Sequence, residues 1–163
     1  MARQPIVIGH SAGGAATLSG LVTGHEDLDA AVLLAPLVRP AAWYWAFPLA
    51  YIASPFVRDL PPRGYEEGFL GVSRLPLSWI NALARWQPVM MNGKPRFQGP
   101  LLLIQGGLDS LVDNDYSKKL ISRLWPNSEY LLVPYGGHIL FDLRSSQAAC
   151  VEAISAFLDR VFP

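Results

Sequence analysis

Ser11 stands between two glycines, in a setting that could make it a nucleophile. The chain reads GHSAG from Gly9 to Gly13, directly after the apolar run 5–8 and at the start of the proline-free stretch 12–23. A strand that turns sharply into a helix at such a sequence exposes its serine above the sheet, in a nucleophile elbow. The flanking glycines allow the tight turn and close packing that a Cβ would obstruct. We therefore predict an elbow here, rather than an ordinary serine in a helix cap.

A serine hydroxyl is a weak nucleophile at neutral pH, so this chemistry needs a nearby base. The chain has three histidines. His10 adjoins Ser11 and its side chain leaves the turn in a different direction, while His25 follows the helix end remote from the serine. His138 follows a strand predicted over 128–133, in a glycine-rich loop where open α/β sheets place catalytic residues. We predict His138 as the base.

Asp109 is the candidate acid that would orient this histidine. It follows the apolar run 101–105, which is typical of a parallel strand buried on both faces. Asp113 and Asp115 compete for the role, but they precede a helical stretch where an N-cap and a first-turn acid are the ordinary explanation. We choose Asp109 and keep Asp113 as the alternative.

The elements that must position these side chains follow from the hydrophobic pattern. Apolar runs alternate with helical patterns, which indicates an α/β fold with a parallel sheet. The predicted strands cover 5–8, 30–34, 101–105 and 128–133, and the predicted helices cover 12–23, 114–124 and 146–161. Residues 1–36 and 100–163 would form the core, and residues 37–99 an insertion. Each of the three candidates would then lie at the C-terminal end of its own strand.

Three sequence features carry a resemblance to a known family: GHSAGG at 9–14, GGLD ending at Asp109, and the Gly137-His138 pair. In the chain order Ser, Asp, His they resemble the serine hydrolases of the α/β-hydrolase superfamily. The similarity is closest to the monoacylglycerol lipase and lysophospholipase branch, which is serine aminopeptidase S33-like. It spans essentially the whole chain, and it implies a Ser-His-Asp triad without cofactor or metal and an oxyanion hole that includes the Ala12 amide.

The resemblance also implies a reaction and a class of substrate. A small-molecule ester or lipid with an apolar acyl group would be cleaved through an acyl-enzyme. Ser11 would attack, His138 would transfer the proton, and Asp109 would hold the imidazole in the required tautomer. The alternative is a truncated, catalytically impaired hydrolase fragment that acts as a binding module or as half of a split protein.

The position of Ser11 departs from the family pattern, because members normally place several strands and helices before the elbow. We therefore expect a partial α/β-hydrolase fold with family strands 5 to 8 and without the N-terminal half. That half normally supplies a second oxyanion donor, whose loss costs on the order of 10²- to 10³-fold in turnover. Residues 5–9 would become an exposed edge strand that favours self-association. Either Met1 is an internal start of a longer protein, or the chain is a fragment that borrows a partner.

The insertion over 37–99 holds most of the chain's aromatic residues and more than half of its prolines. We predict a cap whose apolar wall binds the acyl group; a cap that only packs on the sheet is the alternative. The candidate substrate-binding residues are His10, Trp43, Trp45, Phe47 and Tyr51. The apolar run 40–53 is too short to span a membrane, although its aromatic rings suit peripheral membrane contact.

Composition excludes other classes of protein. The chain has 163 residues, of which 51% are hydrophobic and 16% charged, enough for one globular domain with a real core. Its 13 basic and 13 acidic side chains balance without a basic cluster, so we expect no nucleic-acid partner. The single cysteine, Cys150, excludes a disulfide within the chain and is predicted in the core. Because Met1 leads almost directly into the first strand, we expect no signal peptide and a cytoplasmic protein.

Overall fold

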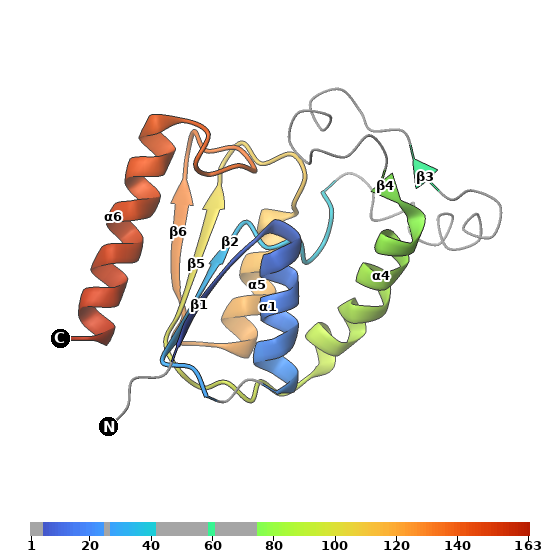
Figure 1. Ribbon diagram of the computed structural model, residues 1–163, viewed down its shortest axis with the longest axis horizontal. Helices are drawn as coiled ribbons and strands as arrows, with labels where there is room; N and C mark the ends of the chain where they lie inside the picture. The colour runs from blue at the N-terminus through green and yellow to red at the C-terminus, as the bar shows by residue number, and fades with distance from the viewer. Residues whose placement is uncertain (1–4, 25–26, 42–58, 61–74) are drawn as a thin grey trace.

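A parallel four-stranded sheet with helices on both faces forms the centre of the molecule (Figure 1). The computed structural model describes residues 5–24, 27–41, 59–60 and 75–163. The sheet order is β1-β2-β5-β6, and every neighbouring pair is parallel. Its strands are β1 (Ile6–His10), β2 (Ala30–Leu34), β5 (Leu101–Gly106) and β6 (Glu129–Val133). The α/β class and the partial α/β-hydrolase topology are thus confirmed.

Helices connect these strands and cover them. The helix α1 (Ser11–Thr23) joins β1 to β2, and α5 (Asn114–Leu124) joins β5 to β6. Together with α4 (Leu77–Asn92), they lie on one face of the sheet, while α6 (Arg144–Val161) lies on the other (Figure 1). Parallel strands require such crossover connections, so the alternation seen in the sequence dictates this layered arrangement.

Each face of the sheet has its own hydrophobic core. Leu33 and Leu103 point to the first face and pack with Leu18 of α1 and Ile121 of α5. Alternate residues of the same strands point to the second face and pack with α6, because successive side chains of a strand point to opposite sides. All residues of β2 and β5 are buried, as predicted from their uninterrupted apolar runs.

The predicted elements of the core agree with the structure, with small differences at their ends. The second strand and the helix over 114–124 have the predicted bounds. The first strand continues to His10 instead of ending at residue 8, and α1 begins at the next residue. The elbow therefore contains no loop: the turn is made at a single residue, Ser11.

Within the insertion, the structure describes a short antiparallel pair and one helix. The pair consists of β3 (Asp59–Leu60) and β4 (Leu75–Pro76), and α4 follows directly. Met90 of α4 and the later Phe97 are fully buried against α1, so the end of the segment over 37–99 packs with the sheet's core. The predicted cap residues Trp43, Trp45, Phe47 and Tyr51 lie outside the described residues, and the cap remains a prediction.

Cys150 is fully buried in α6, where it packs with Phe157 against the sheet, as predicted. Burial raises the pKa of its thiol, because a buried thiolate loses its hydration. Over the described parts of the chain, every helix is too short or too polar to cross a bilayer.

Candidate active site

The elbow is built on a strained residue. Ser11 has a φ of 53°, a left-handed backbone conformation that residues with a Cβ adopt rarely. His10 before it is still extended, with φ −112° and ψ 140°, so the chain changes direction within one residue. The amide of Leu37 donates to the Ser11 carbonyl oxygen at 2.8 Å, which fixes the turn against the segment after β2. Strain of this kind persists where the surroundings determine the conformation, which is frequent at functional sites.

The glycines around the serine have different steric roles. A Cβ on Gly9 would lie 2.5 Å from Oγ1 of Thr17, so only glycine lets α1 approach β1 this closely. A Cβ on Gly13 would meet nothing within 4 Å, and the expectation that this glycine is required for packing is wrong. The second close approach is at Gly14, where a Cβ would lie 3.0 Å from Cα of Pro36.

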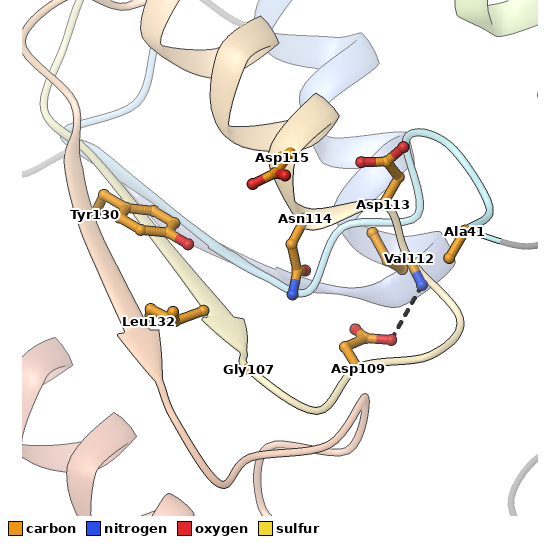
Figure 2. Close-up of a pocket in the computed structure, with 9 residues that line it drawn as sticks. All are labelled: Ala41, Gly107, Asp109, Val112, Asp113, Asn114, Asp115, Tyr130 and Leu132. Carbon is orange, nitrogen blue, oxygen red and sulfur yellow. Dashed lines mark hydrogen bonds between the residues drawn. The ribbon is translucent and has the colours of Figure 1, made fainter.

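The three candidates, one at the elbow and two in separate loops, meet in a hydrogen-bonded chain. Ser11 Oγ lies 2.7 Å from Nε2 of His138, and Nδ1 of the same ring lies 2.9 Å from Oδ2 of Asp109. The Asp109 carboxylate is fully buried, and its Oδ1 accepts the amides of Leu111 and Val112 at 2.8 and 3.0 Å; Figure 2 shows the second bond. A carboxylate only accepts, so Nδ1 of His138 carries the proton and Nε2 can accept the serine proton.

Asp113, the alternative acid, lies elsewhere and has a structural role. It is the N-cap of α5, where its Oδ1 accepts the Tyr116 amide at 2.9 Å. Its Oδ2 pairs with Arg39, whose Nε donates at 2.9 Å. Burial acts to raise the pKa of Asp113, but the hydrogen bonds from Arg39 and Tyr116 and the charges of Arg39 and Lys119 outweigh it and lower the pKa.

No role for Arg39 was predicted from the sequence, but in the structure this residue stabilises the loop that carries Asp109. The segment after β2 runs antiparallel to this loop: the Asp113 amide donates to the Arg39 carbonyl, and the Ala41 amide donates to the Leu111 carbonyl, each at 2.9 Å. The Arg39 guanidinium also lies 4.0 Å from the ring centre of Tyr116. The pair joins residues 74 positions apart, and no local sequence pattern indicates it.

A cavity of about 360 Å³ opens on one side of Asp109, between α5 and β6 (Figure 2). It is lined by Ala41, Gly107, Asp109, Val112, Asp113, Asn114, Asp115, Tyr130 and Leu132. Burial, followed by the negative charge of Asp115, raises the pKa of Tyr130. Neither Ser11 nor His138 lines this cavity, so the cavity borders Asp109 but does not extend to the serine.

Two further candidates lie at the elbow. Ala12 is in the first turn of α1, where backbone amides have no acceptor within their own helix and can donate to a bound anion. His10 reaches the histidine loop: its Nε2 lies 3.0 Å from the carbonyl oxygen of His138, and the two ring centres are 5.2 Å apart.

Comparison with solved structures supports the topology. The structure of the Paleococcus ferrophilus monoacylglycerol lipase superposes with a TM-score of 0.78 at 16% identity, over 96% of this chain and 69% of the lipase. A soluble variant of the Saccharomyces cerevisiae monoglyceride lipase, in complex with a substrate analogue, gives a TM-score of 0.78 at 18% identity, over 96% of this chain and 62% of that lipase. Mouse alpha/beta hydrolase domain-containing protein 10 gives 0.70 at 18%, over 99% and 64%.

The chain therefore spans roughly two thirds of the length of these structures. At such low identity, the likeness shows the shared fold. A comparison with curated proteins finds no match. The family comparison does identify a family, because the model of serine aminopeptidase, S33, matches residues 2–142, well over half of the sequence. With the elbow and the parallel sheet in place, this match shows that the chain belongs to the serine aminopeptidase S33 family of α/β hydrolases.

Proposed function

We propose that the protein is a serine hydrolase that cleaves carboxylic esters of apolar acyl groups. The observation that carries the proposal is the hydrogen-bonded chain from Ser11 Oγ through His138 to Asp109, at 2.7 and 2.9 Å. These distances suit proton transfer from a nucleophile to a base that is held by an acid. The family match and the lipase folds of the structural neighbours support the same reaction class.

The reaction would proceed by acyl transfer to water. His138 Nε2 takes the proton of Ser11 Oγ while that oxygen bonds to the ester carbonyl carbon, and the Ala12 amide stabilises the resulting oxyanion. The bond to the alcohol oxygen then breaks, and His138 returns the proton to this oxygen. Water attacks the acyl-enzyme by the same proton transfers, which releases the carboxylic acid and restores Ser11. Asp109 keeps the imidazole oriented and stabilises its charged form.

The finer substrate assignment is a lysophospholipid or a monoacylglycerol. It rests on the sequence resemblance and on the aromatic residues Trp43, Trp45, Phe47 and Tyr51, which would line an acyl site. Two neighbours are described as a monoacylglycerol lipase and a monoglyceride lipase, and the second structure contains a substrate analogue. Peripheral contact with a lipid surface would follow from such a substrate.

A second candidate is a non-catalytic role, as a binding module or as half of a split protein. The observation that favours it is the second face of β1, where Ile6 and Ile8 are 38% and 52% exposed. Apolar side chains on a strand at the edge of a sheet are a surface on which another polypeptide can pack. The two candidates differ in whether Ser11 reacts.

Labelling with a fluorophosphonate tests this difference, because the probe reacts with activated serines without requiring the natural substrate. We expect stoichiometric labelling of the purified 163-residue chain and none of Ser11→Ala. Ser11→Gly is a second control, because glycine accepts the φ of 53° without strain. A folded chain that the probe leaves unlabelled would contradict the hydrolase proposal and favour the binding module.

A matched pair of substitutions tests the choice of acid. Asp109→Asn keeps the shape of the side chain but cannot hold Nδ1–H of His138 in the same way, and a loss of about 10³- to 10⁴-fold in kcat is expected. Asp113→Asn keeps the N-cap of α5 and should change kcat by less than about 10-fold, since Asp113 pairs with Arg39 instead of His138. Equal losses in the two variants would contradict the assignment of Asp109.

A further inference from the structure

Two consecutive residues of the elbow contact the same histidine. Ser11 Oγ reaches the imidazole of His138 at 2.7 Å, while Nε2 of His10 lies 3.0 Å from the main-chain oxygen of His138. The extended backbone of His10 followed by the left-handed Ser11 directs the two side chains to these two places. A carbonyl oxygen only accepts, so Nε2 of His10 must carry the proton that it shares with His138.

Backbone contacts before His138 also hold the histidine loop, and Leu140 after it is fully buried in the core on the α6 face. The Leu108 amide donates to the Gly136 carbonyl at 2.9 Å. A Cβ on Gly106 would lie 2.3 Å from the Gly137 carbonyl oxygen, so the loop rests directly on the end of β5. These contacts fix the loop relative to β5, which also carries Asp109. The bond from His10 instead joins the loop to β1 and therefore to the serine.

We propose that His10 is a positioning residue for the acyl transfer proposed above, on which this inference rests. By donating to the His138 carbonyl, His10 fixes the separation between Ser11 Oγ and the imidazole. The base and the nucleophile come from strands at opposite ends of the β1-β2-β5-β6 order, so their distance otherwise depends on the whole sheet. The bond from His10 joins the histidine loop directly to the residue before Ser11, so the separation of base and nucleophile is set at the elbow.

Three substitutions at position 10 test separately the hydrogen bond that His10 donates and the size of its ring. His10→Gln places its amide nitrogen near the position of Nε2, His10→Asn places it near that of Nδ1, and His10→Phe keeps a ring without a donor. A displacement of about 1 Å at a catalytic group can cost on the order of 10²-fold. We expect Phe and Asn to lower kcat for a short-chain p-nitrophenyl ester about 10-fold or more with little change in KM, and Gln to stay within about 3-fold of wild type.

Several outcomes would overturn the proposal. Unchanged kcat in the folded His10→Phe variant would show that the bond is not needed. A raised KM with unchanged kcat would identify His10 as a substrate contact, as predicted from the sequence. Equal losses in the Gln and Phe variants would show that the ring itself is required. Circular dichroism and thermal unfolding of each variant confirm that the fold is kept.

Proton NMR separates failure of this inference from failure of the proposed function. The proton shared by Nδ1 of His138 and Asp109 gives a low-field resonance that does not depend on turnover. We expect it in wild type and His10→Gln, and we expect it to broaden through faster exchange in His10→Phe and His10→Asn. The same sharp resonance in all four proteins would overturn the positioning role. Wild type that shows the resonance but resists fluorophosphonate would instead contradict the hydrolase.

Discussion

β1 and β5 each lead to a residue of the proposed triad, but the rest of the molecule covers these strands unequally. All residues of β5 are buried between α5 on one face and α6 on the other. In β1 only Gly9 is buried, and Ile6 and Ile8 on the α6 face are largely exposed. Over the described residues, β1 pairs with β2 alone and lies at the edge of the sheet.

This difference shows that the nucleophile and its partners depend on different supports. Asp109 follows a strand held by two neighbouring strands and two helical layers. Ser11 depends on β2, on the close packing of α1 at Gly9, and on the bonds that join the elbow to Leu37 and His138. The turn at Ser11 is thus held by a few contacts at the elbow, while Asp109 is positioned by the buried strand β5.

The largest effect on stability is expected when the same substitution, isoleucine to alanine, is compared between β5 and β1. Ile104→Ala in β5 should lower the free energy of unfolding by about 2–5 kcal/mol, because it opens a cavity at a fully buried position. Ile8→Ala, on the same face but 52% exposed, should cost less than about 1 kcal/mol. Urea unfolding followed by circular dichroism measures both. Similar costs would mean that β1 is covered in solution.

The next effect concerns the elbow glycines. Gly9→Ala should destabilise the chain by about 1–3 kcal/mol, because its Cβ would enter the space of Thr17 and of the Gly13 carbonyl. Gly13→Ala has room, and alanine in a helix should stabilise by up to about 1 kcal/mol. Thermal unfolding of the two variants gives the comparison. A Gly9→Ala variant as stable as Gly13→Ala would contradict the tight packing of α1 on β1.

Much of the fold could be predicted because its signals are local. Continuous apolar runs are typical of strands buried on both faces, which gave the bounds of β2 and placed β5 closely. The order of Ser11, Asp109 and His138 along alternating strands and helices then predicted one edge of the sheet as their meeting point. The structure brings these three side chains together, although their catalytic roles remain a proposal.

The parts that were not predicted depend on contacts between distant segments. The pair of Arg39 and Asp113 joins residues far apart in the sequence. Which glycine near the serine must lack a Cβ depends on its neighbours in the fold: Gly9 faces Thr17 and Gly14 faces Pro36, while Gly13 faces open space. Within α4, Pro88 interrupts the usual helical pattern, because proline in a helix interior lacks a donor. Propensity argues against the helix, but packing of Met90 in the core stabilises it.

A smaller effect tests the support of the acid loop. Asp113→Asn keeps the N-cap but removes the ion pair with Arg39, and it should cost about 0.5–1 kcal/mol at pH 7. The lowered pKa of Asp113 means that this contribution is present above the ordinary pKa of about 3.9 and is lost as pH falls through the folded value. Stability of wild type and variant should therefore converge below about pH 4. A constant difference down to acidic pH would contradict the charge interaction.

The smallest change in stability is expected for a charge on the exposed strand. Ile8→Lys should alter the free energy of unfolding by about 0.5 kcal/mol or less, yet it should reduce self-association, because a lysine on an edge strand opposes pairing with another chain. Val151→Lys is the matched control, since Val151 is 51% exposed, like Ile8, but belongs to α6 and not to the edge strand. Sedimentation velocity over a range of concentrations should show association of wild type and Val151→Lys and less of Ile8→Lys. Equal association of all three would place the contact elsewhere, and a wild type that stays monomeric would mean that β1 does not mediate self-association.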